Sequence, residues 1–252
     1  MSDALSAAAR TAIGQCLGVG SEESVVVVTD DEREPIGEAM YDAAAAVTDD
    51  VTLLRYPPSD QHGTEPPAPV AAAMAESDVF VAPTTKSLSH TRARGAACAA
   101  DARGATLPGI TQSVFETGLD ADYDAIDAAC DSVLAAVGDA STVRVTAPAG
   151  TDLTVEVGDR EWLADRGVVH APGAFSNLPA GEVFLAPETA SGTVVVDGTM
   201  LPHGRLESGR SVSIEVADGL VTTIDDDAVR ADVEAAAASV GDDAYTFAEL
   251  GI

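Results

Sequence analysis

The sequence predicts an α/β protein in which an open parallel-sheet N-terminal domain is followed by a mixed, mainly β C-terminal domain. Two observations lead to this prediction. Up to about residue 139, β-branched runs alternate with segments of helical periodicity, the order expected of parallel strands joined by helices. From residue 140 onward, short alternating segments separated by turn residues replace that rhythm. We therefore predict an α/β N-terminal domain over residues 1–139 and a β-rich domain over residues 140–252.

The first half is expected to form a sheet with helices on both faces. Residues 24–30 are a continuous β-branched run, which is typical of a strand buried on both sides. Pro35 suits the first turn of a helix. Further strands are expected at residues 51–56, 78–83 and 105–108, and helices at residues 4–17, 35–47, 70–75, 90–102 and 123–137. Because parallel sheets bind ligands beyond the carboxyl ends of their strands, the loops there are candidate binding sites.

The second half is expected to consist of short strands and one long helix. The strands are expected at residues 143–146, 152–157, 168–170, 183–186, 193–196, 211–216 and 220–224. Asp218-Gly219 between the last two is a strong hairpin signal. A helix is expected over residues 226–240, because aspartates at its start suit a helix N-terminus. The apolar ending at residues 248–252 indicates a strand entering a sheet.

The charge balance is extreme. The chain has 42 acidic and 13 basic residues, a net charge of −29, and Lys86 is its only lysine. A surface this negative disfavours nucleic acid and anionic membranes as partners. Acidic residues spread from end to end fit a cytoplasm at molar salt, where screening reduces self-repulsion; the alternative is an ordinary acidic cytosolic protein. We predict a halophilic, cytoplasmic protein.

The N-terminus and the cysteines agree with a cytoplasmic location. The first 19 residues lack the basic region and apolar core of a signal peptide. No apolar run approaches the roughly 20 residues that a membrane span needs. The three cysteines are widely spaced and odd in number, which indicates buried thiols in a reducing compartment rather than disulfides or a zinc site. They are Cys16, Cys98 and Cys130.

Residues 84–91, TTKSLSHT, form a polar loop after the third expected strand. The loop holds Lys86 and His90 directly before a helix. One interpretation is a rim that contacts a substrate or an anion. The other is helix capping by Ser89 or Thr91. A serine–histidine nucleophile built from Ser87 or Ser89 with His90 is disfavoured, because adjacent side chains rarely aim at one another and no G-x-S-x-G elbow is present.

Residues 177–187, NLPAGEVFLAP, place Glu182 at the start of a short apolar strand framed by turn formers. A carboxylate there is either a solvated side chain at the end of a strand or a functional group held in position. The residue types alone favour the solvated strand end.

Three segments together resemble one family. GTDLTV at residues 150–155, NLPAGEVFLAP at residues 177–187 and FAELG at residues 247–251 are similar, in this order, to the aminopeptidase T family, also called the thermophilic metalloprotease family. The chain resembles an acidic, haloarchaeal-type member of it. The resemblance implies that Glu182 and Glu249 are metal ligands. The family's remaining histidine and aspartate ligands would lie beyond Ile252, so we expect a chain truncated at its C-terminus.

The function that this resemblance implies is a metal-dependent aminopeptidase. Two divalent ions, zinc, cobalt or manganese, would activate a water that removes the N-terminal residue of a peptide substrate. The resemblance also implies a homodimer, and it assigns no further catalytic residue. Nearby acids that could supplement the metal site, or be merely solvated, are Asp152, Glu156 and Glu188.

Two alternatives stay open. Related folds include Fe(II)-dependent dioxygenases that open dihydroxypyridine rings with one ferrous ion, a glutamate and an H-x-D pair. The other alternative is a non-catalytic homologue without the full ligand set. Among the remaining residues, His170 is expected to be a hydrogen-bonded structural histidine, His203 to be solvent-exposed in a turn, and Trp162 to serve packing.

Overall fold

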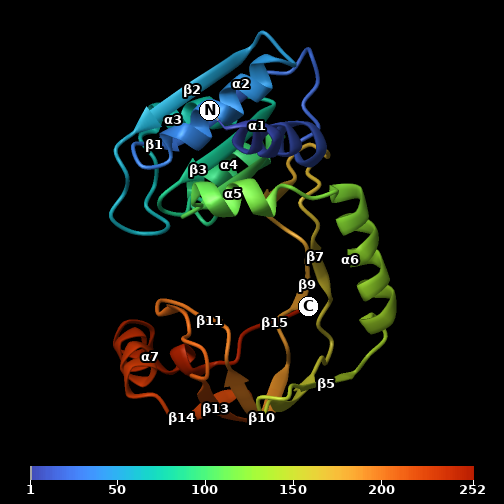
Figure 1. Cartoon of the computed structure of the whole chain (residues 1–252), viewed down its shortest axis with the longest axis vertical. Coiled ribbons are helices and arrows are strands. Elements are labelled where there is room, and N and C mark those ends of the chain that lie inside the picture. Colours follow the sequence, from blue (N-terminus) through green and yellow to red (C-terminus); the bar gives the residue numbers. More distant parts are fainter. Residues whose placement is uncertain (1) are drawn as a thin grey trace. The chain divides into compact units, whose positions relative to one another are not determined.

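The computed structural model describes residues 2–252 and contains two compact units (Figure 1). The first unit comprises the residues up to Ser132 together with Asp165–Glu182, and the second comprises Val133–Ala164 together with Val183–Ile252. Both units are therefore discontinuous in sequence. The predicted division at residues 139/140 stays a prediction.

The first unit contains a five-stranded parallel sheet with the order β2-β1-β3-β4-β8. Its strands are β1 (Val25–Asp30), β2 (Val51–Tyr56), β3 (Val79–Thr84), β4 (Arg103–Pro108) and β8 (Phe175–Asn177). The first four confirm the expected strands. The fifth comes from the second half of the sequence and pairs with β4 through Thr106 and Asn177. The α/β fold class is thereby confirmed.

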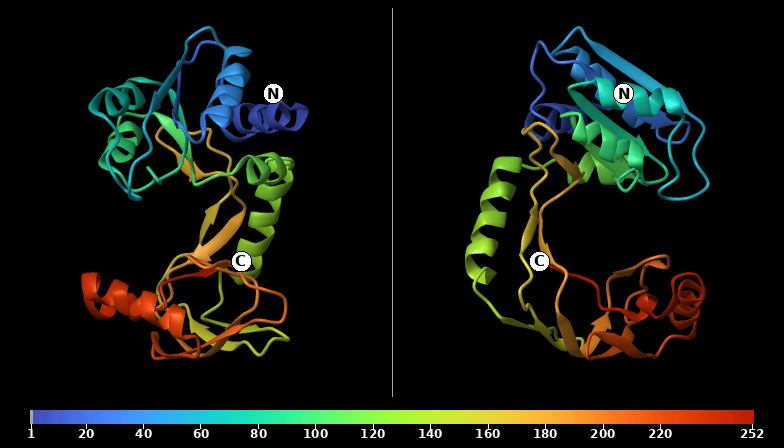
Figure 2. Two further views of the ribbon diagram at one scale, coloured as in Figure 1. Left: turned by 60° about the vertical axis from the view of Figure 1, so that its left-hand side comes forward. Right: turned by 180° about the vertical axis from the view of Figure 1, so that it is seen from behind.

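Helices cover both faces of this sheet (Figure 2). Alternate residues of β1 point to opposite faces, so that Val25 and Val27 join one core and Val26 and Val28 join the other. The helices are α1 (Asp3–Arg10), the π-helical turn η1 (Thr11–Cys16), α2 (Glu34–Ala45) and α5 (Gln112–Gly118) on the first face, and α3 (Ala68–Glu76) and α4 (Arg92–Ala99) on the second. The continuous β-branched run is thus buried on both sides, as predicted.

A buried arginine connects the helical layer to the sheet. The Arg103 guanidinium forms two 2.7 Å hydrogen bonds to the Glu23 carboxylate and donates to the carbonyls of Leu17 and Gly18 at 2.9 and 3.1 Å. This arrangement joins the start of β4 to the segment between η1 and β1. Because a buried charge needs a partner and hydrogen bonds, these contacts fix the path of the chain into the sheet.

The second unit is built on an antiparallel sheet with the order β14-β13-β10-β6-β5. Its strands are β5 (Thr142–Thr146), β6 (Asp152–Glu156), β10 (Thr189–Val196), β13 (Val212–Ala217) and β14 (Leu220–Ile224). Asp218 and Gly219 have φ angles of 52° and 79°, the positive values that a tight hairpin turn requires, which confirms the predicted β13–β14 hairpin.

The remaining elements are short strands and helices. They are β7 (Leu163–Asp165), β9 (Glu182–Leu185), β15 (Leu250–Gly251), β11 (Thr199–Met200), β12 (Gly204–Arg205), α6 (Tyr123–Val137), α7 (Asp227–Val240) and the 3₁₀ turn η2 (Gly241–Tyr245). β15, β9 and β7 form a three-stranded sheet, and β11 pairs with β12. The Asp226 carboxylate caps α7 by accepting from the amides of Ala228 and Val229 at 3.0 and 3.2 Å.

The expected strand at residues 168–170 is wrong. These residues form no strand; instead, the Val169 amide donates to the carbonyl of Cys16 at 2.7 Å, and the Val169 side chain packs in the core of the first unit. The apolar run therefore reflects burial of a connecting segment. Apolar runs of this length do not distinguish a strand from a buried loop. Within residues 2–252, no helix is both long enough and apolar enough to cross a membrane.

Candidate functional site

Glu182 is the first residue of β9, and its neighbours pair with the C-terminal strand β15. The Val183 amide donates to the carbonyl of Ile252 at 3.0 Å, and the Ile252 amide donates back to Val183 at 2.9 Å. Leu185 lies opposite Leu250 in this antiparallel pair. Leu185 is fully buried and Leu250 packs against the core of the second unit. The apolar residues of both strands therefore fix the register of the segments that carry Glu182 and Glu249.

This register places the two glutamates on one face of the strand pair. Phe184 of β9 lies opposite Gly251 of β15. Glu182 precedes Phe184 by two residues, and Glu249 precedes Gly251 by two residues. Because side chains alternate along a strand, both carboxylates emerge on the same face. Continuing the register puts Glu249 opposite Ala186, four residues from Glu182, or about 13 Å along β9. Both glutamates are exposed. They share a face but their backbones are not adjacent.

The described residues do not complete a metal centre around them. Among residues 2–252, no group of three or more His, Cys, Asp or Glu side chains is placed to hold a metal ion. Two of the three supplementary acids are engaged elsewhere. Arg144 donates twice at 2.8 Å to the Asp152 carboxylate and lowers its pKa. Thr142 donates to Glu156 at 2.8 Å. Zinc and iron sites normally need three or more protein ligands, so Glu182 and Glu249 fit only part of one.

A polar cluster lies at the carboxyl ends of the parallel strands in the first unit. The Asn177 Oδ1 atom at the end of β8 accepts from the Ser89 hydroxyl at 2.9 Å and from the Thr106 hydroxyl of β4 at 2.8 Å. The Ser87 hydroxyl donates to Ser89 at 3.0 Å. Carboxyl ends of parallel strands are where such sheets bind ligands. The cluster holds the side-chain amide of the exposed Asn177 in one orientation.

The loop that carries Ser87 and Ser89 is anchored at several points. The Ser87 amide donates to His62 Nδ1 at 3.2 Å, and the Gly63 amide donates to the carbonyl of Ser87 at 2.9 Å. At the end of β1, the buried carboxylate of Asp30 accepts from the amide and hydroxyl of Thr85. These contacts hold the loop after β3 against its neighbours, so the cluster is preformed.

The N-terminus of α4 is capped, as one of the two sequence interpretations expected. The Thr91 hydroxyl accepts from the Arg94 amide at 3.2 Å. The Glu65 carboxylate accepts from the amides of Arg92 and Ala93 at 2.8 and 3.1 Å, and these contacts lower its pKa. The first amides of the helix are therefore already occupied, which argues against anion binding at this terminus. Ser89 belongs to the polar cluster instead of serving as the cap.

The side chains of Lys86 and His90 remain available in the same loop. Neither has a side-chain hydrogen bond or ion pair within the part of the chain that the structure describes, and His90 is exposed. Both basic side chains of the loop at residues 84–91 could therefore contact a ligand at this edge of the sheet.

The other singled-out residues serve structure. His170 Nε2 lies 2.9 Å from the carbonyl of Gln15, so the expected structural histidine is confirmed. His203 lies in a turn and is exposed, as expected, and its Nε2 lies 2.8 Å from the Asp232 carboxylate on α7. The indole nitrogen of Trp162 is buried without a hydrogen-bond partner among residues 2–252, which fits a packing role.

Thr106 and Asp30 are candidate site residues that the sequence does not single out, because their residue types are common at such positions. A single threonine in a strand and an aspartate at a strand end are common. The signal that finds them is position, because both lie at the carboxyl end of a parallel strand. Asn177 is part of a recognised motif, but its partner Thr106 emerges only when β8 pairs with β4.

Comparison with known proteins identifies a family and several solved structures of similar fold. The family described as "NicX: 2,5-dihydroxypyridine 5,6-dioxygenase" matches residues 4–252. The structure of 2,5-dihydroxypyridine dioxygenase from Pseudomonas putida KT2440 superposes with a TM-score of 0.76 at 18% identity, covering 98% of this chain and 75% of that one. Wild-type AmpT from Thermus thermophilus superposes with a TM-score of 0.66 at 16% identity, covering 99% and 77%. No protein with a curated description matches the sequence.

Proposed function

Because the chain belongs to the NicX family of 2,5-dihydroxypyridine 5,6-dioxygenases, we propose that it catalyses the oxygen-dependent ring opening of an aromatic diol of the dihydroxypyridine class. The observation that carries this proposal is the family match over residues 4–252. The similarity in fold to the Pseudomonas enzyme is consistent with it. This proposal replaces aminopeptidase activity as the first choice.

Glu182 and Glu249 are the residues that we propose as metal ligands. They are exposed, lie on one face of the β9–β15 pair and carry the carboxylates that a ferrous ion accepts. A bound ferrous ion would supply the means of activating dioxygen. Because two carboxylates do not complete a coordination shell, we expect the 252-residue chain to bind Fe(II) weakly. Full activity would then need further ligands or a large excess of the ion.

Oxygen uptake tests the proposed reaction. The protein is incubated anaerobically with excess Fe(II), then mixed with 2,5-dihydroxypyridine in air-saturated buffer at low and at molar salt. We expect oxygen consumption that matches loss of the pyridine absorbance and that is reduced in Glu182→Gln. Glu207→Gln is the matched control, because Glu207 is an exposed glutamate of the second unit that carries no proposed role. Absence of uptake under all of these conditions would contradict the proposal.

A metal-dependent aminopeptidase remains the second candidate. The similarity of fold to AmpT from Thermus thermophilus favours it, as do the three motif segments, two of which contain Glu182 and Glu249. Release of the N-terminal residue from unblocked dipeptides in the presence of zinc, cobalt or manganese would support this candidate. The homodimer, the cytoplasmic location and the adaptation to molar salt stay predictions.

A further inference from the structure

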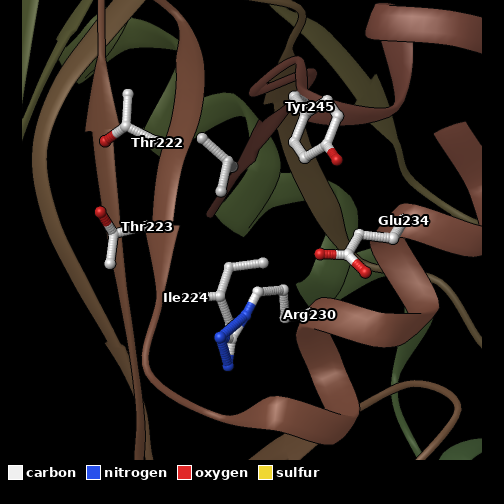
Figure 3. A pocket seen from close by; sticks show the side chains of 7 residues that line it. Thr222, Thr223, Ile224, Arg230, Glu234 and Tyr245 are labelled. Atoms are coloured by element: carbon white, nitrogen blue, oxygen red, sulfur yellow. The ribbon is translucent and has the colours of Figure 1, made fainter.

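A groove lies along the free edge of the second unit's antiparallel sheet. It encloses about 370 Å³, within the range of ligand-binding pockets. Figure 3 shows it between β14 on one side and the side chains of α7 and η2 on the other. Its lining residues are Val221, Thr222, Thr223, Ile224, Arg230, Glu234 and Tyr245.

The lining pattern shows that the groove follows a backbone edge. Successive side chains of a strand point to opposite faces. A cavity that contacts every residue from Val221 to Ile224 is therefore bounded by the edge of the strand and not by one face alone. β13 occupies the inner edge of β14, and β14 is the outermost strand of its sheet. The edge that borders the groove is the outer one.

One end of this outer edge already accepts a strand. Leu220 forms an isolated antiparallel bridge with Thr246, and the Phe247 amide donates to the carbonyl of Gly219 at 2.8 Å. The chain then leaves toward β15. Over Val221–Ile224, no strand of the described residues 2–252 covers the edge. A β-bulge opposite Glu215 and Val216 twists β14, which limits the free edge to a short segment.

The groove also carries an uncompensated negative charge. Glu234 extends from α7 toward β14 (Figure 3), and its carboxylate has no hydrogen-bond or ion-pair partner in the part of the chain that the structure describes. Arg230, one helical turn earlier, is paired with Asp227 instead. A ligand that fills the groove would therefore meet one free carboxylate, backbone groups of a strand edge and the ring of Tyr245.

We propose that this groove binds an extended peptide segment that adds to β14 as a short strand and places a lysine or arginine beside Glu234. Backbone hydrogen bonds to the strand edge would give affinity, and the basic side chain would give selectivity, as in other cases of strand addition. The charge complementarity selects a basic segment over an acidic one. This binding site is separate from Glu182 and Glu249 and does not depend on the proposed ring opening.

Fluorescence anisotropy with two labelled pentapeptides tests the proposal. One peptide is acetyl-Val-Thr-Lys-Val-Thr-amide and the other has glutamate in place of lysine; both are titrated with the full chain at low salt. We expect saturable binding of the lysine peptide. N-methylation of the two backbone amides that face β14 should weaken that binding by about tenfold or more, because it removes hydrogen bonds to the strand edge. Equal binding of the methylated peptide would overturn strand addition.

Charge reversal at Glu234 tests the selectivity. Glu234→Arg should weaken binding of the lysine peptide by about three- to tenfold and strengthen binding of the glutamate peptide. The matched control is Asp242→Arg, which makes the same change in net charge on an exposed residue outside the groove. If both variants change the peptide affinity equally, the net charge of the protein explains the effect, and the proposed binding site is overturned. Dimerisation through β14 that excludes the peptide, seen by light scattering, would also overturn it.

Discussion

Replacing Glu23 by alanine should destabilise the first unit, because it removes the partner of a buried arginine. The Arg103 side chain is 9% exposed and the Glu23 side chain 30% exposed, with both guanidinium hydrogen bonds at 2.7 Å. Removing one partner of a fully buried pair costs about 3–5 kcal/mol. Since water can partly replace the half-exposed carboxylate, we expect a loss of about 2–3 kcal/mol.

The assay is urea unfolding followed by far-UV circular dichroism at fixed salt. Glu22→Ala is the matched control, because Glu22 is exposed and adjacent, and it should cost less than about 0.5 kcal/mol. The hydrogen bonds from Arg103 lower the pKa of Glu23 below its ordinary value of 4.5. The stabilisation is therefore present above about pH 4.5 and is lost as the pH falls through the folded pKa. Equal stability of Glu23→Ala and Glu22→Ala would refute the reasoning.

Three further predictions concern the thiols, a helix cap and a sheet glycine. Burial raises the pKa of Cys16 to about 12, so iodoacetamide at pH 8 should modify the partly exposed Cys98 first, as peptide mass spectrometry would show. Thr91→Ala should cost about 1 kcal/mol in urea unfolding by removing the α4 cap. Gly104→Ala should lower the melting temperature sharply, because the added Cβ would lie 2.5 Å from the carbonyl oxygen of Phe80; an unchanged melting temperature would contradict that packing.

Strong local patterns allowed much of the fold of both units to be predicted. The β-branched run at β1 and the Asp218-Gly219 turn each determine structure within a few residues. β8 could not be predicted, because Phe175–Asn177 is too short to carry a pattern and pairs with β4 from far away in sequence. Non-local pairing of this kind depends on tertiary contacts that a sequence window does not contain.

The sequence motifs nominate Glu182 and Glu249 as candidate site residues, but they do not predict how the two side chains lie relative to one another. The motif around Glu182 and the one around Glu249 were recognised separately, and the β9–β15 register then places both carboxylates on one face. Only part of the polar cluster could be predicted from the sequence, because Ser87 and Ser89 belong to a distinctive polar loop and Thr106 does not. The choice between peptide hydrolysis and ring opening depended on the family match, since the motifs around Glu182 and Glu249 do not separate the two chemistries.

Isotope incorporation from ¹⁸O₂ is the measurement that tests the proposed ring opening most directly. The protein with excess Fe(II) converts 2,5-dihydroxypyridine under labelled oxygen, and the product is analysed by mass spectrometry. A dioxygenase incorporates both labelled atoms into the ring-opened product, and Glu182→Gln should reduce its yield while Glu207→Gln does not. Unlabelled substrate recovered intact, with release of N-terminal residues from dipeptides under zinc or cobalt, would contradict the account.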